Sequence, residues 1–181
     1  LQQWEQELSK EYSAIKSQGL ALDLTRGKPS AEQLSLSDGL DGILNGNYKT
    51  TSGIDTRNYG GLDGIPEARQ IGANILGINI NNILAAGNSS LTLMHQAVVT
   101  AFLFGLNGPA SAWKNENNVK FLCPVPGYDR HFSICQQLGI EMVNVPMTSN
   151  GPDMDIVENL IQNDPSIKGM WCVPKYSNPT G

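Results

Sequence analysis

The sequence Ile167-Lys-Gly-Met-Trp-Cys-Val-Pro-Lys-Tyr-Ser-Asn-Pro-Thr-Gly181 joins an apolar segment to a polar loop. Residues 167–173 are typical of a short strand inside a sheet, and Pro174 ends the pairing because proline has no N–H to donate. The amide of Asn178 can donate and accept hydrogen bonds, and ligands of open α/β sheets bind beyond the carboxyl ends of the strands. We therefore interpret Asn178 as a ligand contact. The alternative is that residues 178–181 form only a turn.

Helix-like and strand-like segments alternate upstream of this stretch. Helices are predicted over residues 66–76, 90–104, 129–138 and 155–162. Strands are predicted over residues 83–86, 119–123, 140–145 and 167–173. Alternation with short connections predicts a three-layer α/β/α fold, with a mostly parallel sheet covered by helices.

The N-terminal part of the chain has a different pattern. A helix is predicted over residues 1–18, because its apolar residues recur at steps of three and four, and Gly19 ends it. We expect residues 1–45 to form this helix and a segment of a smaller domain. Residues 46–181 are then the first part of a larger α/β domain.

Composition and charge exclude several functional classes. The 181 residues are 40% hydrophobic and 16% charged, which is ordinary for a globular protein with a sizeable core. A net charge of −5 without any cluster of Lys and Arg argues against a nucleic-acid partner. No apolar run approaches the roughly 20 residues of a membrane span, and no signal-peptide pattern opens the sequence.

The cysteines and histidines indicate reduced thiols and no metal site. Cys123, Cys135 and Cys172 are odd in number, far apart and in apolar settings, which is typical of a cytoplasmic protein. His95 and His131 have no partners at the spacing of metal ligands. We therefore expect a cytoplasmic protein that binds no metal.

A glycine turn leads into the helix that is predicted to begin at residue 90. The sequence Ala85-Ala-Gly-Asn-Ser-Ser-Leu91 places Asn88, Ser89 and Ser90 at the cap and first turn. Free backbone N–H groups and the positive end of the helix dipole form a site suited to a phosphate. An ordinary helix cap is the alternative. The G-x-G-x-x-G fingerprint and the P-loop lysine of nucleotide-binding proteins are missing.

Two tyrosines lie beside glycines at turns. Tyr128 follows Gly127 at the exit of a predicted strand, where a flat side chain can stack on a planar ligand or pack against the next helix. Tyr59 precedes Gly60-Gly61, a run that resembles a phosphate loop. A backbone bend before Pro66 is the favoured interpretation of that run, and spacing does not decide whether Tyr59 contacts a ligand.

Five stretches resemble the fold-type-I, pyridoxal-phosphate-dependent aminotransferases, in the class I/II group that is similar to aspartate aminotransferase. They are Leu-Thr-Arg-Gly-Lys-Pro at 24–29, Tyr-Gly-Gly at 59–61, Gly-Asn-Ser-Ser at 87–90, Pro-Gly-Tyr at 126–128 and Tyr-Ser-Asn-Pro-Thr-Gly at 176–181. They follow the family's order and approximate spacing, so the resemblance covers nearly the whole chain. It is nearest to a bacterial subgroup whose large domain is related to that of the MocR regulators. It implies an incomplete large domain of the pyridoxal-phosphate transferase fold, with part of a small domain.

The resemblance implies pyridoxal phosphate as the cofactor and assigns it six binding residues, of which five would contact the cofactor of their own subunit. Asn88, Ser89 and Ser90 would hold the phosphate. Tyr128 would stack on the pyridine ring, and Asn178 would hydrogen-bond the 3-oxygen of that ring beside the substrate. The cofactor would then act as the electron sink of the reaction.

The resemblance also implies substrate and subunit contacts. Arg26 and Gly27 would line the pocket for the substrate carboxylate. Tyr59 would reach the cofactor phosphate of a neighbouring subunit, because the family shares active sites across a homodimer. The family places its Schiff-base lysine, its ring-nitrogen aspartate and its main carboxylate-binding arginine after the Asn-Pro-Thr-Gly segment. Lys28 and Lys175 do not match the lysine motif, so we assign no catalytic residue up to Gly181.

The expected activity is the transfer of an amino group between an amino acid, with aspartate as the first candidate, and a 2-oxo acid. One alternative is the ligand-sensing aminotransferase-like domain of a MocR-type transcription regulator. The first helix counts against it, because no basic residues are massed on one face. A doubly wound nucleotide-binding domain is the second alternative, and the missing glycine fingerprints disfavour it.

Overall fold

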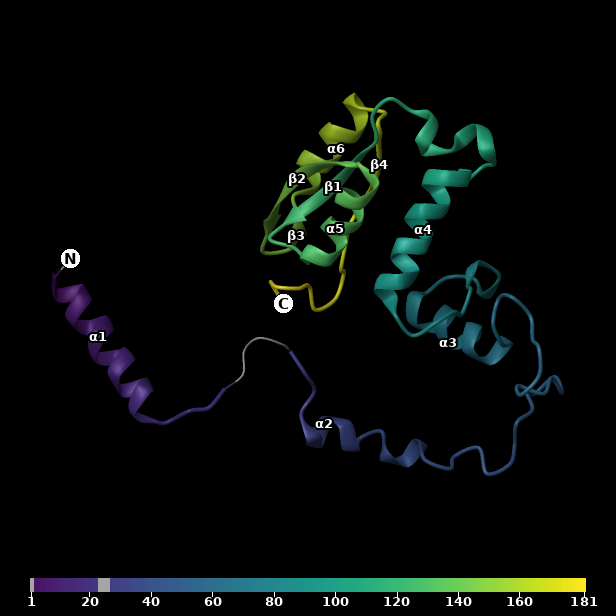
Figure 1. The fold of residues 1–181 in the computed structure, drawn as a ribbon, viewed down its shortest axis with the longest axis horizontal. Coiled ribbons are helices and arrows are strands. Elements are labelled where there is room, and N and C mark those ends of the chain that lie inside the picture. The colour runs from purple at the N-terminus through teal and green to yellow at the C-terminus, as the bar shows by residue number, and fades with distance from the viewer. Residues whose placement is uncertain (1, 23–26) are drawn as a thin grey trace. The chain divides into compact units, whose positions relative to one another are not determined.

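The structure is a computed structural model that describes residues 2–22 and 27–181 (Figure 1). The chain forms two compact units, Leu1–Tyr59 and Gly60–Gly181. The division therefore lies after Tyr59, and the assignment of residues 1–45 to a small domain stays a prediction. Within the described ranges, no helix is long and apolar enough to cross a membrane.

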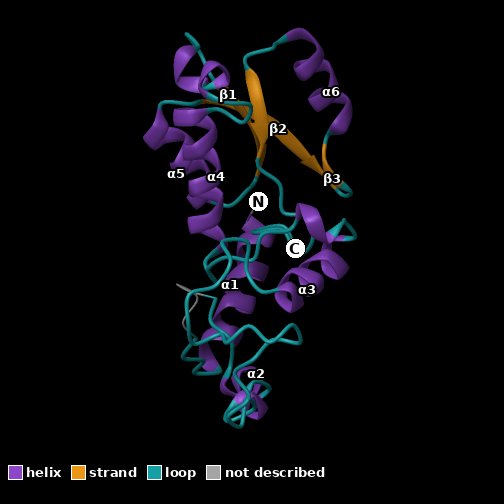
Figure 2. Ribbon diagram, turned by 90° about the vertical axis from the view of Figure 1, so that its right-hand side faces the viewer, coloured by secondary structure: helices purple, strands orange, loops and turns teal. Residues whose placement is uncertain are grey.

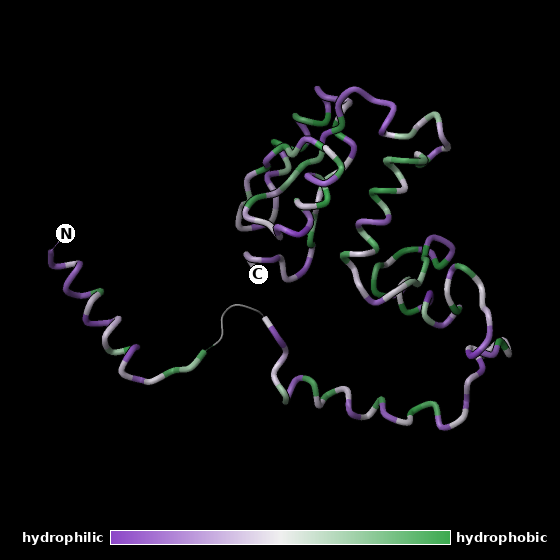
Figure 3. The backbone as a smooth tube through the Cα atoms, in the orientation of Figure 1, coloured by the Kyte–Doolittle hydropathy of each residue, from purple (hydrophilic) through white to green (hydrophobic). Residues whose placement is uncertain are grey.

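Helix α1 (Gln2–Ser17) of the first unit confirms the predicted N-terminal helix. Its apolar residues alternate with polar ones (Figure 3), and Trp4 and Tyr12 are 64% and 66% exposed. A short helix that the sequence analysis did not predict, α2 (Ala31–Ser35), begins after Ser30. The Ser30 hydroxyl accepts from the Gln33 N–H, and the Gln33 side chain accepts from the Ser30 N–H, which is a capping box.

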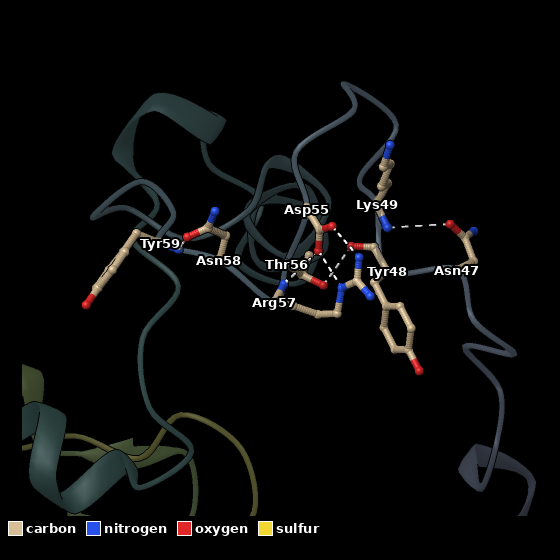
Figure 4. A network of polar contacts seen from close by, with 8 residues as sticks. All are labelled: Asn47, Tyr48, Lys49, Asp55, Thr56, Arg57, Asn58 and Tyr59. Atoms are coloured by element: carbon tan, nitrogen blue, oxygen red, sulfur yellow. Dashed lines mark hydrogen bonds and ion pairs between the residues drawn. The ribbon is translucent and has the colours of Figure 1, made fainter.

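Polar contacts hold an exposed turn between residues 47 and 57 (Figure 4). Lys49 and Asp55 form an isolated antiparallel bridge. Arg57 donates to both oxygens of the Asp55 carboxylate, at 2.9 and 2.6 Å, and lies 4.7 Å from the centre of the Tyr48 ring. The hydrogen bonds from Arg57 lower the pKa of Asp55 to about 2. This turn ends just before Tyr59, whose side chain is fully exposed.

The second unit contains a four-stranded sheet. Its strands are β1 (Lys120–Val125), β2 (Glu141–Thr148), β3 (Gly151–Pro152) and β4 (Ile167–Met170). The strand order is β3-β2-β1-β4. β1 pairs in parallel with β2 and β4, and only the two-residue β3 runs antiparallel, to β2. The predicted mostly parallel sheet is confirmed.

Helices cover both faces of the sheet (Figure 2). Helices α4 (Ser90–Phe104) and α5 (Asp129–Leu138) lie on one face, and α6 (Met154–Asn163) lies on the other. Side chains of β1 alternate between the two: Phe121 and Cys123 pack in the core below α4 and α5, and Leu122 packs with Val157 of α6. The three-layer α/β/α prediction is therefore confirmed.

The strand predicted over residues 83–86 is wrong. Helix α3 (Pro66–Leu76) ends at Gly77, as predicted, and a single 3₁₀ turn (Ile80–Asn82) follows it. The next residues are not part of any ladder in the described structure. The Ile83 carbonyl accepts from the Arg69 side chain at 2.9 Å, and the Ala85 N–H donates to the Asp63 carbonyl at 2.8 Å. Side-chain and loop groups thus take the hydrogen bonds that a neighbouring strand would need.

The last strand is shorter than predicted. β4 ends at Met170, although the Trp171 N–H still donates to the Leu122 carbonyl at 3.0 Å. The chain then leaves the sheet before Pro174. This early exit opens space at the end of β4 for the loop that carries Asn178.

Candidate functional site

A cleft of about 750 Å³ lies at the carboxyl ends of the parallel strands. Its walls come from three segments: residues 124–128 around the end of β1, residues 147–152 where β2 turns into β3, and residues 170–181 around and beyond the end of β4. A ligand site is predicted from the sequence at this edge of the sheet, because that is where open α/β sheets bind ligands. The structure provides a cleft there.

Tyr128 and Asn178 both line this cleft. Tyr128 is the residue before helix α5 and is 36% exposed, so part of its ring is covered and part is free. Asn178 is exposed in the loop after β4. Fifty residues of sequence separate these two side chains, and the parallel pairing of β1 and β4 brings them to one cleft. Stacking by Tyr128 and hydrogen bonding by Asn178 stay predictions.

The turn before Tyr128 requires glycine. A Cβ at Gly127 would lie 2.7 Å from Cζ of Phe132 and closer still to the Pro124 carbonyl oxygen. The chain therefore folds back tightly between β1 and α5, and Tyr128 is held at the rim. Gly87 differs: its φ is not in the left-handed region, and a Cβ there would meet nothing within 4 Å. The turn before α4 does not need a glycine.

A run of rings leads from Tyr128 into the core. The Tyr128 and His131 rings meet edge to face, with centroids 5.2 Å apart and an interplanar angle of 85°. His131 stacks on Trp171 at 5.2 Å and 26°, and the indole N–H of Trp171 donates to Sγ of Cys135 at 3.2 Å. His131 also lines the cleft but is only 5% exposed. Burial lowers its pKa.

Two buried thiols lie beneath these rings. Cys123 and Cys135 are unpaired cysteines with 1% and 0% exposure. A hydrogen bond with Cys135, together with burial, raises the pKa of the Cys123 thiol. Cys123 therefore stays protonated and packs as a small apolar side chain. In the part of the chain that the structure describes, no group of His, Cys, Asp or Glu is placed to hold a metal ion.

Asn88, Ser89 and Ser90 are exposed at the N-terminus of α4. The Ser89 hydroxyl accepts from the Thr92 N–H at 3.3 Å and from the Thr92 hydroxyl at 3.0 Å, so its role as a helix cap is confirmed. The first N–H groups of a helix have no partner within it, which leaves donors for an anion. These residues do not line the cleft, but α4 begins at the end of the unit where the loop after β4 lies (Figure 1). Phosphate binding stays a prediction.

Tyr59 and Gly27, two of the three remaining predicted residues, belong to the first unit. Tyr59 is fully exposed. Gly27 is exposed, and a Cβ on it would meet nothing within 4 Å. Arg26 lies outside the described residues. Their predicted contacts with a substrate and with a second subunit remain untested.

His131 and Trp171 line the cleft, although neither was predicted from the sequence as a residue of the site. His131 was weighed only as a metal ligand. The spacing of three between Tyr128 and His131 places them on neighbouring positions of one helical turn, and this was the available signal. Nothing local indicates that Trp171, forty residues further on, stacks against His131.

Comparison with known proteins gives one consistent family. The sequence model of the family described as aspartate amino-transferase matches residues 1–181. An aspartate aminotransferase of Corynebacterium glutamicum is 50% identical over 177 residues, which are 97% of this chain and 41% of that protein. The crystal structure of an aspartate transaminase from the same species is 48% identical with a TM-score of 0.84, over 98% of this chain and 42% of that one.

A distant structure shows the same fold. The α-aminoadipate aminotransferase of Thermus thermophilus, solved with N-(5′-phosphopyridoxyl)-L-leucine, has a TM-score of 0.57 at 19% identity, over 86% of this chain and 36% of that one. The chain spans about two fifths of the length of the curated relatives it matches.

Proposed function

Because the chain belongs to the aspartate aminotransferase family, we propose that the protein transfers an amino group between an amino acid and a 2-oxo acid, with pyridoxal phosphate as its cofactor. The observation that carries this proposal is the presence of Tyr128 and Asn178 in one cleft at the carboxyl ends of the strands. A flat, polar ligand needs an aromatic face and a directional polar partner, and these two residues supply them.

The residues present suit each part of the cofactor. Tyr128 offers a partly free ring for a planar group, and the amide of Asn178 can donate to an oxygen on that group. The exposed start of α4 offers backbone donors and the hydroxyls of Ser89 and Ser90 to a dianionic phosphate, with Asn88 beside them. When bound, pyridoxal phosphate supplies the electron sink that makes proton loss from an amino acid possible.

The substrate and subunit contacts form a finer part of the proposal. Aspartate is the first candidate as amino donor, which the name of the C. glutamicum relative supports. Arg26 and Gly27 are the candidates for holding its carboxylate. Tyr59 is the candidate for reaching the cofactor phosphate of a second copy of the protein in a homodimer, and its full exposure leaves it accessible to a partner. The odd number of cysteines favours the cytoplasm.

An absorbance titration of the full-length protein tests the proposal. Added pyridoxal phosphate is expected to develop a visible band that survives dialysis, and aspartate is expected to convert this band to one at shorter wavelength. Tyr128→Ala is expected to weaken retention of the cofactor, whereas Tyr12→Ala, on α1, serves as the matched control. A wild-type protein that loses all of the cofactor on dialysis would contradict the proposal.

A further inference from the structure

His131 is a buried residue of the cleft whose ring packs between two aromatic side chains. It is 95% buried, being 5% exposed, and it lines the cleft from the first turn of α5. Among the described residues, none makes a hydrogen bond or ion pair with the His131 ring. Its ring nitrogens are not among the fully buried polar atoms that lack a partner, so the contacts of the ring itself are the feature that needs a physical account.

The contacts of His131 are with rings. Tyr128 meets it edge to face at 5.2 Å and 85°, and Trp171 stacks on it at 5.2 Å and 26°. The backbone N–H of His131 donates to the backbone carbonyl of Tyr128 at 3.1 Å, and this hydrogen bond closes the first helical turn between the two residues. His131 therefore lies between the exposed ring of the cleft and a fixed ring of the core.

Trp171 is well anchored. It is 7% exposed, its ring packs against Phe121 at 5.0 Å and 46°, and its N–H donates to Cys135. Movement of Trp171 would disturb the packed face of β1, where a close-packed core resists displacement. Because Trp171 is held by the core and stacks on His131, it restricts the orientation of the His131 ring.

We propose that His131 is a positioning residue, which fixes the angle at which Tyr128 presents its free face to a bound pyridoxal ring. This inference rests on the proposed function, because it concerns the same cleft and the same cofactor. Edge-to-face contacts are directional, so a ring at position 131 favours one orientation of the Tyr128 ring over others. The lowered pKa of His131 keeps the imidazole neutral near pH 7, as a ring packed between two aromatic side chains needs to be.

A double-mutant cycle in the full-length protein tests this role. The dissociation constant of pyridoxal phosphate is measured by equilibrium dialysis for wild type, Tyr128→Ala, His131→Ala and the double variant. An aromatic pair suggests that His131→Ala raises the constant by about threefold to tenfold. In the Tyr128→Ala background the same change is expected to have an effect of less than about twofold, because His131 acts through Tyr128. His95→Ala is the matched control.

A spectroscopic signature and a rescue separate positioning from stability. The circular dichroism that the protein induces in the bound cofactor is expected to fall in His131→Ala. His131→Phe, which keeps a ring, is expected to restore it, and His131→Gln, which keeps only polarity, is not. Rescue by Gln but not Phe would show that the nitrogen atoms matter and would overturn the proposal.

The remaining outcomes are also decisive. Equal effects of His131→Ala in both backgrounds would leave the proposed function standing and remove the positioning role. Loss of folding in both His131→Ala and His131→Phe would make His131 a core residue and contradict the proposal. A wild-type protein that does not bind pyridoxal phosphate would contradict the proposed function itself, and this inference with it.

Discussion

At the scale of single residues, Asn178 is the most direct link between the cleft and the cofactor. An amide that donates to the 3-oxygen of the ring changes the electron distribution of that ring. We expect Asn178→Ala to shift both the wavelength and the pH dependence of the visible absorbance of bound pyridoxal phosphate. The control is Asn74→Ala, on the exposed side of α3. An unchanged spectrum from acid to alkaline pH would remove Asn178 from the site.

Ser89 and Ser90 are expected to differ although they are neighbours. Ser89 caps α4, so Ser89→Ala should lower the free energy of unfolding by about 1 kcal/mol, and Ser90→Ala should leave it nearly unchanged. The double variant should weaken cofactor retention by a few kcal/mol at most, because backbone donors remain. Urea unfolding and dialysis of the loaded protein measure the two effects, with Ser133→Ala as the control. Wild-type retention in the double variant would exclude both hydroxyls from phosphate binding.

The residues of the cleft were predictable to different degrees. Tyr128 and Asn178 could be paired from sequence, because the carboxyl ends of parallel strands meet at one edge of a sheet. The contact of His131 with Trp171 could not, since it depends on how far β4 extends before the chain leaves the sheet. Two roles were predicted for Ser89 from the sequence, a helix cap and a phosphate contact. The structure confirms the helix cap, and the phosphate contact stays a prediction.

At the scale of elements, an ion pair ties the end of α6 to β1. Lys120 donates to Asp164 at 2.8 Å, and the Ser166 N–H donates to the same carboxylate at 2.9 Å. The hydrogen bond from Lys120, followed by those from Ser166, lowers the pKa of Asp164 from 3.8 to about 2. A carboxylate whose pKa is lower in the folded state than in the unfolded state stabilises the fold at any pH above its unfolded-state pKa. This contribution is lost as the pH falls through the folded-state pKa.

Replacing Asp164 therefore tests the pH dependence of stability. Between pH 3.8 and about 2, wild type should lose stability more steeply than Asp164→Asn, and the variant should be the less stable of the two at neutral pH. The midpoint of urea unfolding, followed across this range, measures the effect. Glu158→Gln on α6 is the control. Parallel curves for wild type and Asp164→Asn would show that the ion pair contributes nothing.

Element boundaries were predicted well where the signals are local. Pro66 begins α3, and Gly77 and Gly139 end α3 and α5 with φ of 68° and 67°, the left-handed conformation that glycine adopts readily. The strand at 83–86 was wrong, because strand formation requires a neighbouring backbone that local sequence does not specify. The two-residue β3 has too little sequence for a strand pattern.

At the scale of the whole molecule, apolar side chains are exposed on both units. On α1, Trp4 is 64% exposed, and on α3, Ile75 and Leu76 are 73% and 64% exposed. Apolar surface of this kind usually becomes buried against further protein. We expect residues 1–181, produced alone, to bind a hydrophobic dye and to self-associate, and the full-length protein to do neither. Dye fluorescence and light scattering measure this, and equal dye binding by both would contradict it.

The central claim is that one planar molecule contacts Tyr128, Asn178 and the start of α4 together. A crystal structure of the full-length protein with pyridoxal phosphate tests this most directly. We predict the ring against Tyr128, the Asn178 amide within hydrogen-bond distance of the ring oxygen, and the phosphate at the backbone N–H groups of Ser89 and Ser90. A cofactor bound away from Tyr128, or a phosphate held far from α4, would contradict the account.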